Sequence, residues 1–314
     1  MEKLVIATRS SPLALRQANE IADTLKEAGF SIEMKAIETI GDKKLDVTIS
    51  KIGDKGVFTQ ELEEMLLNGE AHLAVHSAKD MPSRLPEGLE IVAFTIREKP
   101  IDVLVSEKKD FQLENKKLLI GTASTRRVAT LKRYFPEIET VTIRGNLQTR
   151  IRKMKEGQCD ALLLAYAGIY RMGYLELISQ ELDIKVFTPA VGQGSMAIEI
   201  SKNLLPAIKL RLQNVLQDPE TALALNAERA FLRKMDGGCS IPVFGYAKYE
   251  NDLLTITGGI ISLDGKEEIR KILTQEMAVS DIGNAILLGQ KLGETILNAG
   301  GDSILSKIKQ NLQH

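Results

Sequence analysis

The chain has 314 residues, and 41 basic against 42 acidic residues give a formal net charge of −1. This length predicts two or three domains, and a hydrophobic content of 44% with 26% charged residues is ordinary for a globular protein. The near-zero net charge, the 4% aromatic content and the absence of Trp argue against a nucleic-acid partner, and no apolar run approaches membrane length.

The first predicted element is a short apolar strand at residues 4–8. Because no signal peptide precedes it and two cysteines cannot make a disulfide framework, we expect a cytoplasmic protein. Ser10 or Ser11 suits an N-cap and Pro12 the first helical turn, so a helix follows up to Gly29. The first lobe continues with a strand at 30–36, a loop and candidate lid at 40–56, a helix at 59–68 and a strand at 71–76.

A second lobe is predicted to begin near residue 97. Strands are expected at 102–105, 118–122, 140–143 and 161–165, with helices after Ser124 and Asn146. Alternating strands and helices of this length favour parallel α/β sheets. Residues 188–194 are predicted to cross back to the first lobe. The expected domains are residues 1–96 plus 195–216, residues 97–194, and residues 217–314.

The chain after about Asp218 is predicted to form a small α+β unit. Leu223, Ala227 and Phe231 lie on one stripe of an amphipathic helix, which we expect to end at Gly237. Strands are expected around 246, at 253–261 and at 270–274, before a helix at 282–297.

The sequence Gly237-Gly-Cys-Ser-Ile-Pro242 follows that helix. It presents the Cys239 thiol between two glycines and a rigid dipeptide, where a partner could reach it. Taken alone, the same turn is explained somewhat better by a small buried cysteine. Cys159 begins an apolar strand and is predicted to be a core residue.

One local pattern recurs: an apolar strand, small or hydroxyl residues, arginine, and then a helix. It contains Arg9, the pair Arg126 and Arg127, and Arg144, with a looser version ending at Arg171. Free N–H groups at helix starts bind anions, and arginine adds a bidentate donor. Any one of these arginines is most simply a surface or capping charge. Several at equivalent strand ends, which face one crevice in open α/β sheets, predict a small polyanionic ligand.

Nucleotide and metal sites are disfavoured. No P-loop motif is present, and although residues 192–197 match G-x-G-x-x-A, Pro189 and Pro206 interrupt the required βαβ unit. His72 and His76 lie four apart on a predicted strand, roughly 13 Å from one another, so they cannot share a metal. We therefore expect no metal.

The strand before residue 77 leads into a second chemical cluster, Ser77-Ala-Lys-Asp80. It places the Asp80 carboxylate beside the predicted cationic crevice. An ionised carboxylate there can accept an N–H hydrogen bond and stabilise a passing cation. Taken alone, a turn aspartate before Met81-Pro82 is an equally good interpretation.

These residues together match one family over essentially the whole chain. The chain resembles the hydroxymethylbilane synthase (porphobilinogen deaminase) family. The motifs that carry the resemblance are Ala7-Thr-Arg-Ser-Ser-Pro-Leu-Ala-Leu15, Lys55-Gly-Val-Phe58, Val75-His-Ser-Ala-Lys-Asp80, Gly121-Thr-Ala-Ser-Thr-Arg-Arg127, Arg144-Gly-Asn-Leu-Gln-Thr-Arg150, Leu164-Ala-Tyr-Ala-Gly168, Pro189-Ala-Val-Gly-Gln-Gly194 and Gly237-Gly-Cys-Ser-Ile-Pro242. Phe244 departs from the small residue usual at its position.

The resemblance implies an α/β fold with two periplasmic-binding-protein-like domains, a cleft between them, and a small α+β C-terminal domain. It implies a deaminating transferase of tetrapyrrole biosynthesis that joins four porphobilinogens into hydroxymethylbilane. Family members carry a covalent dipyrromethane cofactor on the cysteine that corresponds to Cys239. Nothing in the pattern demands more than a monomer, and no nucleic acid, membrane or metal is expected as a partner.

By the same resemblance, Asp80 would be the catalytic acid/base, with Lys79 beside it. The residues expected to bind cofactor and substrate are Arg9, Ser11, Gln17, Lys51, Lys55, Phe58, Ser77, Ser124, Arg126, Arg127, Arg144, Arg150, Arg171 and Gln193. The alternative is a non-catalytic, two-lobed anion-binding protein. The Gly-Gly-Cys motif favours the enzyme.

Overall fold

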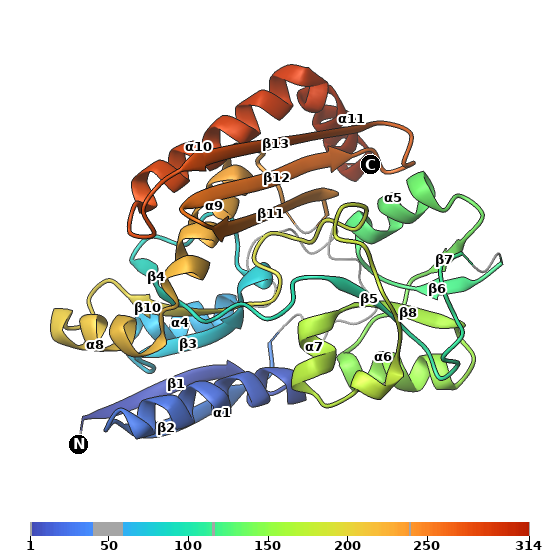
Figure 1. Cartoon of the computed structure of the whole chain (residues 1–314). Helices are drawn as coiled ribbons and strands as arrows, with labels where there is room; N and C mark the ends of the chain where they lie inside the picture. The colour runs from blue at the N-terminus through green and yellow to red at the C-terminus, as the bar shows by residue number, and fades with distance from the viewer. Residues whose placement is uncertain (1, 40–58, 115–116, 239, 314) are drawn as a thin grey trace.

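The computed structural model describes residues 2–39, 59–114, 117–238 and 240–313, and these form three sheets with their helices (Figure 1). We call the parts built on the three sheets the first, second and C-terminal domains. The predicted loop at 40–56, together with Lys51, Lys55, Phe58 and Cys239, lies outside the described residues.

The first domain has a five-stranded sheet in the order β2-β1-β3-β10-β4. Its strands are β1 (Lys3–Arg9), β2 (Ser31–Ile37), β3 (Leu73–Ser77), β4 (Leu89–Phe94) and β10 (Met196–Ser201), and its helices are α1 (Pro12–Glu27), α4 (Gln60–Leu67) and α8 (Pro206–Leu216). Alternation in β1 directs Leu4 and Ile6 towards α1 and α8, whereas Ala7 packs with α4 on the opposite face. Helices therefore cover both faces of this sheet.

The second domain has a five-stranded sheet in the order β7-β6-β8-β5-β9. The strands are β5 (Asp102–Val105), β6 (Leu119–Gly121), β7 (Glu139–Val141), β8 (Ala161–Ala165) and β9 (Ile178–Glu181), and the helices are α5 (Thr125–Tyr134), α6 (Leu147–Lys155) and α7 (Tyr166–Arg171). Leu131 of α5 packs on one face, and Ile151 of α6 and Ile169 of α7 pack on the other. A short 3₁₀ turn, Leu175–Leu177, precedes β9.

The prediction of parallel sheets is only partly right. β1 is parallel to β2 and β3, and β6 is parallel to β7 and β8, but β10 runs antiparallel to β3 and β4, and β5 runs antiparallel to β8 and β9. β10 enters the first sheet after the chain has crossed back from the second domain, as predicted. Both sheets are therefore mixed.

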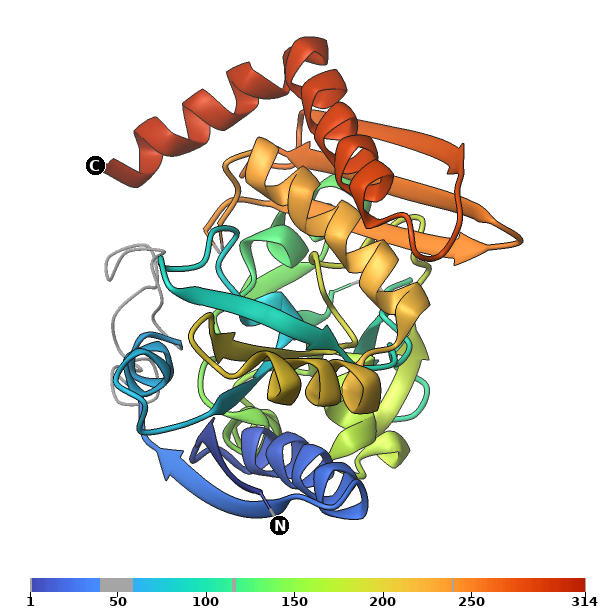
Figure 2. The same ribbon diagram turned by 90° about the vertical axis from the view of Figure 1, so that its left-hand side faces the viewer.

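The C-terminal domain is an antiparallel sheet of β11 (Val243–Glu250), β12 (Leu253–Ile261) and β13 (Glu268–Glu276). Helices α9 (Pro219–Lys234) and α10 (Ile282–Ile296) pack together against one face of it (Figure 2). Helix α11 (Asp302–Gln313), which follows a π-turn at Leu297–Gly301, was not predicted. Phe231 occupies the core, and a Cβ at Gly258 would lie 2.8 Å from its ring, so this strand position requires glycine.

Pro206 occupies the first position of α8, where its missing N–H costs nothing, and the glycines before β10 do not lead into a helix. One local prediction is wrong. Helix α9 does not end through Gly237, because the left-handed residue is Asp236, with φ of 47°. Gly237 is needed for space instead: a Cβ there would lie 2.7 Å from the Leu232 side chain.

A buried ion pair fastens the domains to one another. The Glu228 carboxylate on α9 is fully buried and accepts hydrogen bonds from Arg97, from the Gly192 N–H at 2.8 Å and from the Ala247 N–H at 2.7 Å. Residue 97 lies in one crossing between the first two domains, and residue 192 in the other. One carboxylate thus ties both crossings to the C-terminal domain.

Arg97→Gln is expected to lower the free energy of unfolding by roughly 3–5 kcal/mol, because it leaves the buried charge of Glu228 without its partner. Urea denaturation measures this change. Lys99→Gln is the control, since it removes an exposed pair with Glu181 and should leave the midpoint unchanged. Equal midpoints for the two variants would contradict a clamping role for Arg97.

Candidate active site

A cavity of about 60 Å³ lies at the carboxyl ends of β1 and β3. A smaller one of about 30 Å³ lies between the first and second domains, and the two share Leu13, Gln17 and Ser77. We call these two cavities together the cleft. Five predicted site residues line the larger cavity, namely Arg9, Ser11, Gln17, Ser77 and Asp80, and Lys79 and Arg171 line the smaller one.

The first domain positions its side chains through the junction of β1 with α1. Ser11 holds the N-cap position, as predicted, but its side chain makes no capping hydrogen bond and faces the cavity instead. Gln17, six residues further along, exchanges two hydrogen bonds with the Ser77 hydroxyl, at 3.1 and 3.2 Å. These bonds tie the helix to the end of β3, from which the reactive residues extend.

Lys79 and Asp80 occupy a 3₁₀ turn, Ala78–Asp80, directly after β3. The Ala78 N–H donates to the Ser195 carbonyl at 2.9 Å. A Cβ at Gly192, where φ is 79°, would lie 2.8 Å from the Ala78 backbone, so glycine permits this close approach. The crossing back to the first domain thereby fixes the turn that carries both residues.

The environment of Lys79 disfavours its charge. Burial is the main cause and lowers the pKa of its ammonium to about 8, and Arg127 and Arg126 lower it further, against the opposing effect of Asp80 and Asp102. Lys79 is therefore a cation below pH 8 and becomes neutral above it.

This titration predicts a pH dependence. If Lys79 helps to hold a polyanionic ligand, kcat/KM should fall as the pH rises through about 8, where the ammonium loses its proton. Lys79→Arg should keep its charge and so move that fall to higher pH. Initial rates from pH 6.5 to 9.5 measure both profiles. Identical alkaline limbs in the two proteins would exclude Lys79 as the titrating group.

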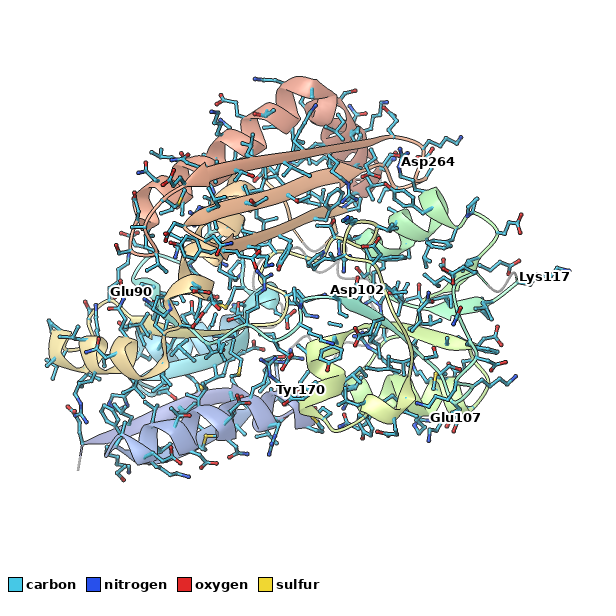
Figure 3. All side chains as sticks on the ribbon, viewed as in Figure 1. Glu90, Asp102, Glu107, Lys117, Tyr170 and Asp264 are labelled. Carbon is cyan, nitrogen blue, oxygen red and sulfur yellow. The ribbon has the colours of Figure 1, made fainter. Side chains whose placement is uncertain are left out.

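Arg126 and Arg127 share one acidic partner, Asp102. Figure 3 labels Asp102 at the start of β5. Asp102 opens β5 and is fully buried, and its two oxygens lie 2.8 Å from Arg126 Nη2 and 2.7 Å from Arg127 Nη2. Burial acts to raise the pKa of Asp102, but the two guanidinium charges outweigh it and hold the pKa well below its usual range. Two cations against one anion leave this cluster with a net positive charge.

The pair keeps capacity for a ligand. The second Nη of Arg126 donates to the Thr188 carbonyl and that of Arg127 to the Leu163 carbonyl, which fixes both planes. The two Nε atoms are buried and have no hydrogen-bond partner among the described residues. Ser124 caps α5 by accepting from the Arg127 N–H at 3.5 Å, in agreement with the predicted helix start.

Arg150 is close enough to charged residues of both the first and the second domain to be affected by their charges. It lies near the start of α6, which Asn146 caps, and its Nε donates to the Gly145 carbonyl at 2.7 Å. Burial lowers its pKa to about 10, and the charges of Arg127, Arg144 and Arg9 add to this effect, while Asp80 opposes it. The predicted arginines of both domains are thus close enough to influence one another.

Two predicted site residues lie differently from the expected pattern. Arg171 is at the end of α7 rather than at a helix start, and its Nη2 donates to the Gly194 carbonyl at 2.9 Å. Gln193 is 1% exposed, and its Nε2 donates to the Pro100 carbonyl and to Asp102. Arg171 thus joins the smaller cavity to the crossing between the domains, and Gln193, which lies in that crossing, contacts Asp102.

His72 and His76 both have protein partners. His72 Nδ1 accepts a hydrogen bond from the Val5 N–H, and His76 Nε2 lies 3.0 Å from a Glu199 oxygen. Within the part of the chain that the structure describes, no cluster of three or more His, Cys, Asp or Glu side chains could hold a metal, and no helix is long and apolar enough to span a bilayer.

The G-x-G-x-x-A sequence runs into β10 and not into a helix, so it lacks the dinucleotide-binding geometry.

Comparison with known proteins identifies the family of the chain. A profile described as porphobilinogen deaminase, dipyrromethane cofactor binding domain, matches residues 4–206, and the porphobilinogen deaminase C-terminal domain matches residues 222–298. Porphobilinogen deaminase of Desulfosudis oleivorans is 48% identical over 97% of both chains, and that of Cytophaga hutchinsonii is 48% identical over 99% of both. The chain belongs to the porphobilinogen deaminase family.

Solved structures give weaker likenesses. The methionine-binding protein MetQ matches 68% of this chain and 89% of its own, with 10% identity and a TM-score of 0.44, which is too low to support a conclusion.

The charged residues that act on Lys79 at the smaller cavity fit the dipyrromethane group that characterises porphobilinogen deaminases. Such a group carries several carboxylates, and the net positive Asp102 cluster with its two unpartnered Nε atoms offers matching donors. Cys239 lies outside the described residues. On either side of it, the Ile241 N–H donates a hydrogen bond to the Gly238 carbonyl at 3.1 Å.

Three buried acidic residues that pair with other charged or ionisable side chains were not predicted from the sequence. Asp102 holds two arginines, Glu199 faces His76, and Glu228 joins the crossings to α9. Each is a carboxylate inside an otherwise apolar strand or helix face. That contrast is a readable signal, because a buried charge requires a partner.

Proposed function

We propose that the chain is a hydroxymethylbilane synthase. It joins four porphobilinogen molecules head to tail into the linear tetrapyrrole hydroxymethylbilane and releases one ammonia at each addition. The observation that carries the proposal is one carboxylate, Asp80, facing a cavity near guanidinium groups from both domains, in a chain related to porphobilinogen deaminases over its full length. Porphobilinogen carries an acetate and a propionate, which suit this charge pattern.

The dipyrromethane, when bound, would supply the terminal pyrrole to which the first unit is added, and each later unit would be added to the ring before it. Cys239 would hold it through a thioether, and Ser124, Arg126, Arg127 and Arg150 would bind its carboxylates. Arg9, Ser11, Lys79, Arg144 and Arg171 would bind the acidic side arms of the substrate. For Lys51, Lys55 and Phe58 the support is the motif alone.

Asp80 is proposed to act on the incoming substrate. Its carboxylate can accept the pyrrole N–H and stabilise the positive charge that develops as ammonia leaves. The same group can take the proton that the accepting ring loses, because it lines the larger cavity. Gln17 and Ser77 hold the end of β3 in place for this chemistry.

Incubation with porphobilinogen tests the proposal. An enzyme of this kind releases one ammonia per substrate consumed and yields a linear tetrapyrrole that cyclises, with loss of water, to uroporphyrinogen I. A non-catalytic anion-binding protein would retain porphobilinogen stoichiometrically and release no ammonia, and that result would refute the proposed function.

The remaining proposals concern organisation. Domain boundaries at 1–96 plus 195–216, 97–194 and 217–314 are supported by the three separate sheets and by α8, which packs against α1 and β4 of the first domain. We propose a cytoplasmic monomer without nucleic-acid or membrane partners, on the basis of the near-zero net charge and the low aromatic content.

A further inference from the structure

Three arginines gather where the first domain meets the C-terminal domain. Arg229 and Arg233 lie one helical turn apart on α9, and Arg229 Nη2 donates to the Pro82 carbonyl at 2.9 Å. Arg84 is two residues further along the same loop as Pro82. We call these three residues the arginine cluster.

The position of the cluster follows from the pattern of α9. Near its start, Ala222 and Leu225 pack with Ala78 and Met81 of the first domain. Further along the helix, on the side that meets the same loop, the apolar residues give way to Arg229 and Arg233. An interface that begins as hydrophobic packing therefore becomes cationic.

The cluster has no ion-paired carboxylate among the described residues. None of its arginines forms an ion pair there, although Arg229 is only 5% exposed. Glu199 is the carboxylate that acts on Arg229, but its oxygen lies 3.0 Å from His76 Nε2. Asp236 acts on Arg84, but the Asp236 carboxylate is already paired with Lys309.

Burial, with the charge of Arg233, lowers the pKa of Arg229 to about 10. Burial, with Arg84, likewise lowers the pKa of Arg233. Like charges held together in this way favour an anion.

The cluster lies on the two chain segments that carry the reactive groups. Arg84 follows Asp80 by four residues, and α9 leads directly into Gly237, Gly238 and the attachment position at Cys239. A chain fixed at one segment and reacting at the other would run between the two segments that carry the cluster.

The growing chain brings more carboxylates than the arginines beside Asp102 can pair with. Each added pyrrole brings two carboxylates, and the chain grows from two to six rings. The charges of Arg126 and Arg127 are partly used by Asp102, which leaves less positive charge for the carboxylates of later rings. Later rings therefore need a further cationic surface.

We propose that Arg84, Arg229 and Arg233 form a second carboxylate site, which holds the acidic side arms of rings during the late additions. This inference rests on the proposed function. It assigns to the C-terminal domain a part in elongation besides carrying the cofactor.

The test uses Arg84→Gln, Arg233→Gln and the double variant, which spare the buried Arg229. Lys234→Gln is the matched control, because it removes one exposed charge from the adjacent position on α9. Each holoenzyme is mixed with limiting porphobilinogen, and intact-mass spectrometry counts the rings attached over time. We expect normal cofactor mass and normal early additions in all variants. Late additions should slow roughly tenfold per lost arginine, so that early complexes accumulate.

The outcomes separate the two proposals. Variants whose ring distribution matches that of Lys234→Gln, or whose additions all slow equally, would overturn the second carboxylate site while leaving the proposed function intact. An unsubstituted chain that carries no primer and adds no rings would overturn the proposed function itself, and this inference with it.

Discussion

Asp80→Asn is expected to fold normally, to carry the mass of the dipyrromethane cofactor, and to lose turnover by roughly 10²–10⁴-fold. Asparagine keeps the shape of the side chain but removes its negative charge. Asp80 is the only acidic residue among the described residues that line the larger cavity. Without it, the positive charge that develops as ammonia leaves would face only the surrounding guanidinium groups.

The kinetic signature distinguishes chemistry from binding. Because the lost interaction strengthens in the transition state, kcat should fall far more than KM rises. Asp110→Asn, an exposed carboxylate away from the cleft, is the control and should retain full activity. Turnover of Asp80→Asn within about threefold of the unsubstituted enzyme would remove Asp80 from the mechanism.

The sequence allowed prediction of those site residues whose position is fixed locally. Arg9, Ser11 and Ser124 follow a strand and begin a helix within a few residues, so turn chemistry and capping determine where they lie. Asp80 belongs to the same class, since it directly follows β3. Such junctions meet at the carboxyl edge of their sheet, and in the first domain the Arg9, Ser11 and Asp80 side chains line one cavity. Ser124 lies at the corresponding junction of the second domain, where it caps α5.

Partners that are distant in sequence could not be predicted. Arg126 contacts Asp102 across 24 positions and two elements, and Arg97 contacts Glu228 across 131. The direction of β10 was also unpredictable, because a strand buried on both faces has the same apolar run in either orientation. The end of α9 was mistaken because glycine is needed there for packing space, whereas Asp236 supplies the left-handed conformation.

Cys239→Ser is expected to abolish the covalent cofactor and, with it, all turnover. The freshly isolated unsubstituted protein should be heavier than its sequence by two pyrrole units, and the variant should have the mass of its amino acids alone. A serine hydroxyl is a far weaker nucleophile than a thiolate at neutral pH, so it cannot replace the sulfur in forming the bond to the pyrrole methylene. Intact-mass spectrometry under denaturing conditions measures both proteins.

Cys159→Ala supplies the matched control for this experiment. Cys159 is 5% exposed, and burial raises the pKa of its thiol to about 11, so it is a core residue with almost no thiolate at neutral pH. The control should therefore keep the full mass excess, apart from the lost sulfur, and its activity. If the excess followed Cys159, or if Cys239→Ser retained both excess and turnover, the primer would be attached elsewhere. The arginines of the cleft would then have to be reassigned to a different bound anion.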